Sequence, residues 1–361
     1  MIRLSKHQLF TLIFVFEVGS TPIFALGIEA EQNAWIVVLL ALLIGLFILW
    51  SYLELQKAFP TKGLVEIFTN ILGKPLGLPL CILYAMGFIW GCGRNLREFI
   101  ELIAMTVIPH TPLWIILFFF IGLSLYVSVK GFEVFARTTE FIFPTIIFFL
   151  IILFALISIS GEVHFKNLTP ILGDGLKPIL KSLPGVVWFP FGEIYVFLMY
   201  WHYVNDINTI KKASFKAVIL SGILLCFTTM INICTLGAKY TSIATIPLVE
   251  TLRLINIGDI ITHLDVIGVI IIFLGGFFKM TLYLNGIAII INSVFSIKKS
   301  QLVLILTGIF MMYFSIYFEP SFAYHQWMFP FDARYYGLPF ALIYPQLLLL
   351  IYILKKKRAE L

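Results

Sequence analysis

Long apolar runs separated by short polar segments dominate the chain from His7 to Leu354. A helix needs about 20 consecutive apolar residues to cross a bilayer, and on that measure the sequence predicts ten membrane-spanning helices. They cover about residues 7–28, 34–58, 77–108, 112–129, 135–160, 180–203, 213–238, 260–293, 300–318 and 337–354. The third and eighth runs are long enough to tilt in the membrane or to extend beyond it.

Two of these runs are interrupted near the middle. The first contains Gly19-Ser20-Thr21-Pro22, and the sixth contains the stretch 183–193, with Pro184, Pro190 and Gly192. Proline cannot donate a helical hydrogen bond, and freed backbone groups are tolerated at membrane depth only against protein or a watery cavity. A single interruption of this kind is more often a simple kink.

The spacing of the two interruptions indicates a repeat. The two broken runs are spans one and six, an odd offset of five, so the second half of the chain enters the membrane in the opposite orientation. Paired interrupted helices at matching positions are typical of a substrate site near the membrane midplane. We therefore predict one membrane domain over residues 1–361, built from an inverted repeat of about 7–160 and 180–354.

Ionisable residues lie within two further spans. The third span contains two pairs of opposite charge spaced four residues apart: Arg94 with Glu98, and Arg97 with Glu101. We expect each pair to form an ion pair on the helix surface. These charges allow two interpretations. They could form a structural ladder of ion pairs near the end of the helix, or Glu98 could face the binding site.

The eighth span carries Lys279 one turn after Gly275-Gly276. A buried lysine requires a carboxylate partner or a lowered pKa; the candidate partners are Glu193, Glu98 and Glu17. Lys279 could fill an ion site, act as a proton-linked switch, or simply extend to the membrane surface. The predicted substrate-binding residues are Gly19, Ser20, Thr21, Pro22, Glu98, Phe191, Gly192, Glu193, Lys279 and Tyr283.

Composition supports the membrane assignment, because 60% of residues are hydrophobic and only 12% are charged, against about 25% charged in soluble domains. Basic residues collect in alternate loops, which predicts cytoplasmic N- and C-termini. The net charge of +6 therefore reflects topology, and no nucleic-acid partner is expected.

The four cysteines lie in apolar runs and are expected to be reduced. Residues 245–256 read as a short amphipathic helix opened by Pro247.

The chain contains no Walker loop, hydrolytic triad or metal-ligand cluster, so neither an enzymatic activity nor a cofactor is expected. The broken spans resemble the five-plus-five LeuT-type fold of the amino acid–polyamine–organocation transporters. That resemblance implies that backbone amides of span one hold a substrate carboxylate, while spans three, six and eight supply the other walls.

A narrower resemblance, to the spore germination permeases, rests on the order and spacing of several short motifs. These are the Gly19–Pro22 break, Gln32-Asn33-Ala34-Trp35, Arg97-Glu98-Phe99, Gly131-Phe132-Glu133, Ala136-Arg137-Thr138-Thr139-Glu140 and Asn167-Leu168-Thr169-Pro170-Ile171-Leu172. Members of that family are the B subunits of nutrient-germinant receptors in endospore-forming bacteria.

The resemblance implies a small-molecule germinant, expected to be an amino acid, and a location in the spore inner membrane. It also implies two partners, a receptor A subunit and a lipoprotein C subunit. The alternatives are a proton- or ion-coupled amino acid transporter and a purely structural membrane subunit. The two breaks and the buried charges argue against the structural subunit.

Overall fold

The computed structural model describes residues 3–257 and 264–360. Within them, nine segments are long and apolar enough to cross a membrane. The first predicted span makes the tenth: its helix, α1, has only 13 residues because the span breaks after it. The α-helices are α1 Lys6–Val18, α2 Ala34–Ala58, α3 Leu64–Leu72, α4 Lys74–Thr106, α5 Leu113–Lys130, α6 Phe132–Ile159, α7 Lys177–Trp188, α8 Ile207–Ile243, α9 Pro247–Arg253, α10 Asp265–Phe295, α11 Ser300–Tyr317, α12 Phe322–Phe331 and α13 Tyr344–Glu360.

The first break lies where it was predicted. The N–H of Gly19 donates to the carbonyl of Val15 at 2.8 Å, the last helical bond of α1. The Thr21 hydroxyl donates to the carbonyl of Glu17 at 2.6 Å, which satisfies an acceptor freed by the break. The chain then forms the short 3₁₀-helix η1, Thr21–Ile23, with Pro22 inside it.

The second break lies between α7 and the 3₁₀-helix η4, Phe191–Met199. Helix α7 ends at Trp188, and Pro190 precedes η4. The remainder of the predicted sixth span is therefore 3₁₀-helix, continued by η5, Trp201–Tyr203. Both interrupted helices of the prediction are confirmed.

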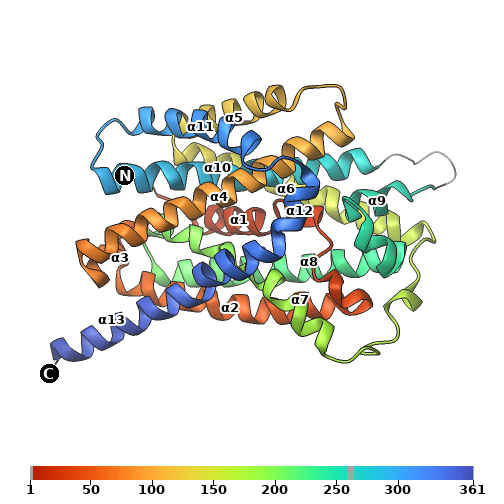
Figure 1. Cartoon of the computed structure of the whole chain (residues 1–361), viewed down its shortest axis with the longest axis horizontal. Helices are drawn as coiled ribbons and strands as arrows, with labels where there is room; N and C mark the ends of the chain where they lie inside the picture. Colours follow the sequence, from red (N-terminus) through yellow and green to blue (C-terminus); the bar gives the residue numbers. More distant parts are fainter. Residues whose placement is uncertain (1–2, 258–263, 361) are drawn as a thin grey trace.

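Helix lengths and packing reproduce the inverted repeat. The third membrane span of each half is a long helix: α4 has 33 residues and α10 has 31. The fourth span of each half, α5 or α11, has 18 residues. The halves interlock: α1 packs against α8, and α2 packs against α7. Helix α1 lies inside the bundle, surrounded by the longer helices (Figure 1).

Helices α4 and α10 make the most extensive contact between the two halves. A Cβ at Gly276 of α10 would lie 1.6 Å from Cζ of Phe99 on α4, so only glycine fits there. Small residues allow such close approach of helices in a membrane. This approach brings the ionisable residues of both helices toward the broken spans.

Two segments differ from the sequence prediction. Helix α3 lies in a stretch predicted as a loop, where its apolar face is buried against α4.

The tenth span was predicted from residue 337 but begins at Phe322. Asp332 and Arg334 interrupt its apolar run in the sequence, whereas the backbone continues through the π-helical turns η6, Asp332–Gly337, and η7, Pro339–Ile343. Residues 260–263 of the eighth predicted span lie outside the described residues. The amphipathic helix opened by Pro247 is present as α9.

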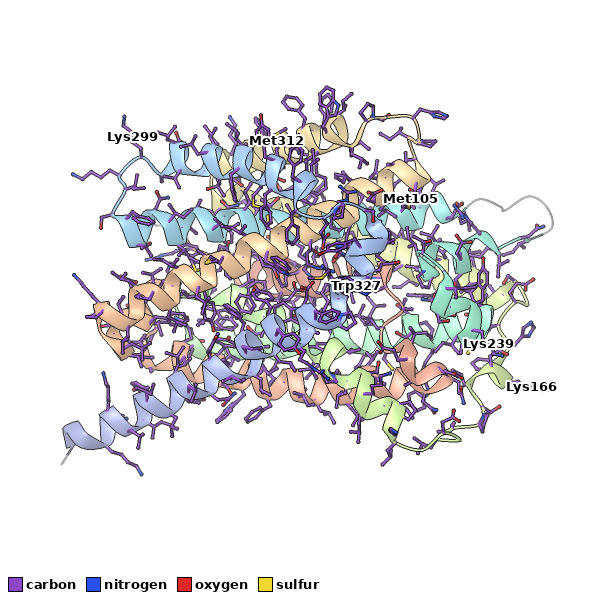
Figure 2. The ribbon with its side chains drawn as sticks, viewed as in Figure 1. Met105, Lys166, Lys239, Lys299, Met312 and Trp327 are labelled. Atoms are coloured by element: carbon purple, nitrogen blue, oxygen red, sulfur yellow. The ribbon has the colours of Figure 1, made fainter. Side chains whose placement is uncertain are left out.

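Both chain termini lie at the same end of the bundle (Figure 1). Lys299 lies at that end, while Lys166 and Lys239 lie at the opposite end (Figure 2). An even number of crossings places the termini and Lys299 at one end, and an odd number of preceding crossings places Lys166 and Lys239 at the other. Large apolar side chains such as Phe141 and Phe119 are 82% and 69% exposed on α6 and α5, as expected of surfaces that face lipid. The chain is a multi-pass membrane protein.

Candidate functional site

A buried ion pair lies between the second break and α10. The Lys279 ammonium donates to the Glu193 carboxylate at Oε2, and both side chains are almost fully excluded from solvent. The Tyr283 hydroxyl donates to the other oxygen, Oε1, at 2.6 Å. Glu193 is therefore satisfied on both oxygens. Of the three carboxylates considered as partners of Lys279, the structure selects Glu193.

Two aromatic rings complete the surroundings of the lysine. The Lys279 Nζ lies 4.4 Å from the ring centroid of Phe189 and 5.0 Å from that of Phe16. Phe16 precedes the first break and Phe189 lies in the second. Neither phenylalanine is among the predicted site residues, although each lies within three residues of one.

The first break meets α10 at two glycines. A Cβ at Gly19 would lie 3.1 Å from Cδ of Lys279, and one at Gly275 would lie 3.0 Å from Cα of Gly19. The Ser20 hydroxyl donates to the side-chain oxygen of Asn95 on α4 at 2.8 Å. The break is thereby fixed between α4 and α10, with the Lys279 stem lying along its backbone.

Glu17, in the last turn of α1, is the second carboxyl group beside this ion pair. It is completely buried, and within the described part of the chain neither carboxyl oxygen has a hydrogen-bond partner. It directly follows Phe16, whose ring lies 5.0 Å from Lys279 Nζ. The site therefore contains one ammonium group and two carboxyl groups.

Some predicted site residues face other parts of the protein. A Cβ at Gly192 would lie 2.8 Å from Cβ of Ala341, so this glycine permits packing against the tenth span. Phe191 packs against Gly45 of α2. Glu98 faces His325, with Oε1 3.1 Å from Nε2. The remaining predicted residues, Thr21 and Pro22, form the turn of the first break.

Arg94 belongs to a separate buried cluster. Its NH1 group lies 2.7 Å from Glu319 and 2.6 Å from Asp332, and Glu319 also lies 2.6 Å from Nδ1 of His325. The predicted Arg94–Glu98 pair is therefore wrong, because partners from the segment after α11 reach Arg94 instead. The predicted Arg97–Glu101 pair is confirmed at 2.6 Å. A signal for the cluster was present in the sequence: residues 319–332 carry three ionisable groups between apolar runs.

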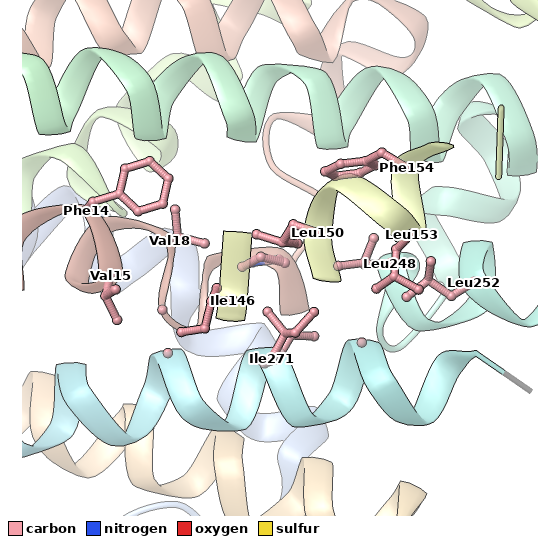
Figure 3. A pocket seen from close by; sticks show the side chains of 15 residues that line it. Phe14, Val15, Val18, Ile146, Leu150, Leu153, Phe154, Leu248, Leu252 and Ile271 are labelled. Carbon is pink, nitrogen blue, oxygen red and sulfur yellow. The ribbon is translucent and has the colours of Figure 1, made fainter. Parts of the chain in front are cut away.

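Two cavities adjoin the first break. The smaller, of about 20 Å³, is lined by apolar side chains from α1, α6, α9 and α10, together with Gly19, Pro22 and Gly275 (Figure 3). The larger, which we call the vestibule, has a volume of about 610 Å³. It is lined by residues 23–29, by parts of α7 between Lys181 and Val186, and by parts of the segment between Gln326 and Tyr335, among other residues. The vestibule is large enough for a small solute.

Ten spans, two broken helices and a buried ion pair between them define a transporter-like membrane protein. The chain belongs to the spore germination protein family, the spore permeases, whose family model matches residues 3–323. Spore germination protein KB of Bacillus subtilis (strain 168) is 32% identical over 360 residues, covering 99% of this chain and 96% of that protein. Spore germination protein YndE of the same strain is 30% identical over 210 residues, covering 58% and 56%.

The fold is shared with a solved transporter. A substrate-bound, outward-open Na⁺-coupled sialic acid symporter superposes with a TM-score of 0.69 at 13% sequence identity, covering 94% of this chain and 78% of that one. This similarity confirms the LeuT-like five-plus-five fold.

Proposed function

We propose that this chain is the nutrient-binding B subunit of a spore germinant receptor. A small nutrient, expected to be an amino acid, binds at mid-membrane between the two broken helices and triggers germination. The observation that carries the proposal is the buried Glu193–Lys279 pair, which lies where both breaks meet. Membership of the spore germination family supports the receptor role.

The proposed site combines Gly19, Ser20, Thr21 and Pro22 with Glu193, Lys279 and Tyr283. The vestibule adjoins it at Ile23, which lines the cavity and directly follows Pro22. Ligand enters through the vestibule and favours one conformation of the broken helices. A receptor A subunit and a lipoprotein C subunit then transmit the signal, and the complex resides in the spore inner membrane with both termini of this chain in the cytoplasm.

The alternative is an ion-coupled amino acid transporter, which the fold of the sialic acid symporter favours. Transport requires the site to open alternately to each side of the membrane. A sensor requires only that ligand binding shifts a conformational equilibrium.

The experiment that separates the two uses purified protein. Binding of a panel of amino acids and sugars is measured by calorimetry, and uptake of each ligand that binds is measured in liposomes containing this chain alone. We expect saturable binding with little net uptake, and ligand-dependent germination that requires co-expressed A and C subunits. Gradient-driven accumulation in the liposomes would transfer the function to the transporter alternative.

A glycine variant tests where the ligand binds. Gly19→Val adds a side chain where even a Cβ lies 3.1 Å from the Lys279 stem, so we expect nutrient binding to weaken by about tenfold or more, or about 1.4 kcal/mol. Gly122→Val on α5 is the matched control, because among the described residues no atom beyond its own stretch of helix lies within 4 Å of a Cβ there. Normal binding by a well-expressed Gly19→Val protein would remove the site from the first break.

A further inference from the structure

The Lys279 ammonium occupies surroundings that would suit the ammonium group of a ligand. A carboxylate, Glu193, contacts it directly, and the rings of Phe16 and Phe189 lie 5.0 Å and 4.4 Å from Nζ. Carboxylates and aromatic faces are the groups with which proteins bind alkylammonium ions. We call the three residues Phe16, Phe189 and Glu193 the ammonium cage.

The walls of the cage and its occupant come from different elements. Phe16 lies at the first break, and Phe189 and Glu193 lie at the second. Lys279 enters from α10, with its stem against Gly19. The Tyr283 hydroxyl, at 2.6 Å from Oε1, fixes the orientation of the Glu193 carboxylate independently of Lys279. The cage is thus built by the two broken helices that form the proposed nutrient site.

Glu17 offers Lys279 a second position. Among the described residues, neither of its buried carboxyl oxygens has a hydrogen-bond partner. Glu17 directly follows Phe16, whose ring lies 5.0 Å from Lys279 Nζ, and it precedes Gly19, against which the lysine stem packs. The lysine stem is flexible and its ammonium has no fixed hydrogen-bond geometry. Moving Lys279 from Glu193 to Glu17 would leave the lysine paired and the cage open.

We propose that the cage is the ammonium subsite of the nutrient site and that Lys279 fills it as a tethered substitute when no ligand is bound. A nutrient with a primary ammonium group displaces Lys279 onto Glu17, so that two carboxyl groups then face two ammonium groups. This inference rests on the proposed function. It specifies the ligand class as small solutes with a primary ammonium group, such as amino acids and amines, and excludes sugars from this subsite.

Displacement also couples binding to conformation. Before ligand binds, Lys279 joins α10 to the second break; afterwards it joins α10 to α1, and the ligand joins the second break. The exchange changes which broken helix is tied to α10. A ligand that contacts one arrangement selectively shifts the equilibrium toward it.

The test measures calorimetric binding of four probes, alanine, ethylamine, propionate and glucose, to the full chain in nanodiscs. Lys279→Met removes the tethered competitor, so alanine and ethylamine should bind at least about tenfold more tightly, because a tethered group competes at a high effective concentration. Propionate and glucose binding should be unchanged. Lys216→Met is the control, because Lys216 is an exposed lysine 5.5 Å from the ring of Phe10.

Glu17→Gln supplies the second arm. It removes the alternative partner of Lys279, so alanine should bind about tenfold more weakly than to the unmodified chain. In the Lys279→Met background the same substitution should have almost no effect on alanine binding. An equal loss in both backgrounds would show that Glu17 does not receive Lys279 and would overturn the exchange.

A stability measurement covers the case in which Lys279→Met folds poorly. Lys279→Ala leaves Glu193 without its cation. Added ethylamine should raise the thermal unfolding temperature of the Lys279→Ala protein while leaving that of the unmodified chain almost unchanged.

Absence of both ethylamine rescue and ethylamine binding overturns the inference. If the unmodified chain binds glucose or propionate but no variant binds an amine, the nutrient site stands and the ammonium subsite fails. If ethylamine binds Lys279→Met but no nutrient binds any form, the cage stands and the proposed function fails.

Discussion

Glu193 is held from one side of the bundle by two residues of α10, Lys279 and Tyr283. The three polar groups lie among buried aromatic and aliphatic side chains, where an unpaired charge has no water to stabilise it. The main effect of the ion pair on stability is therefore the free-energy cost of removing one of its members, rather than the net attraction between the two.

A double-mutant cycle measures that cost. Lys279→Met should lower the free energy of unfolding by about 3–5 kcal/mol, because Glu193 is left as an uncompensated buried charge. Adding Glu193→Gln should restore much of the loss, and the two effects should depart from additivity by at least about 1 kcal/mol. The measurement is thermal unfolding in detergent, with Lys216→Met as control. Strict additivity would contradict direct pairing.

Helix α4 is joined to the tenth span by charges. Arg94 bridges Glu319, just after α11, and Asp332, at the end of α12, while Glu98 and Glu319 lie on either side of the His325 ring. All five side chains are buried. The cluster therefore fixes the irregular start of the tenth span against the long helix of the first half.

Loss of the arginine should release that join. Arg94→Met leaves the carboxylates of Glu319 and Asp332 without their common cation, and we expect a loss of about 3–5 kcal/mol in unfolding free energy. Arg137→Met is the control: Arg137 is 69% exposed in its pair with Glu133, so its loss should cost less than about 1 kcal/mol.

The restoring variant is Arg94→Met with Asp332→Asn, which should recover part of the stability in thermal unfolding. Equal unfolding temperatures for Arg94→Met and Arg137→Met would show that the cluster does not stabilise the tenth span.

At the scale of the whole molecule, loop charges and chain ends define a topology. Both termini and Lys299 lie at one end of the bundle, and Lys166 and Lys239 lie at the other (Figures 1 and 2). Basic residues are retained preferentially on the cytoplasmic side. The sequence places more basic residues in the loops expected at the end with the termini, so the proposed topology has that end in the cytoplasm.

Single-cysteine labelling tests this orientation. The four native cysteines are buried, so a membrane-impermeant maleimide should react chiefly with an introduced exposed cysteine. Lys166→Cys and Lys239→Cys should label in intact cells, and Lys299→Cys only after permeabilisation. The reverse pattern would invert the topology, and labelling of Lys166→Cys and Lys299→Cys from the same side would contradict the three crossings that lie between them.

The sequence by itself determined the spans, the two breaks and the repeat, because each depends on local properties. Run length reports whether a segment can cross the bilayer, and proline with glycine reports where a helix must open. It also reduced the partners of Lys279 to three carboxylates, since few ionisable residues occur in apolar runs.

Only the tertiary structure decided which of those groups meet. Arg94 and Glu98 are one helical turn apart, yet Arg94 pairs with Glu319, 225 residues away. Phe16, Phe189 and Lys279 converge because the broken helices of both halves pack against α10. Such contacts depend on how helices cross and rotate, which is fixed by close packing such as that of Gly276 against Phe99. Hydrophobic periodicity gives a helix its apolar faces, but its partners are selected by the packing of the whole bundle.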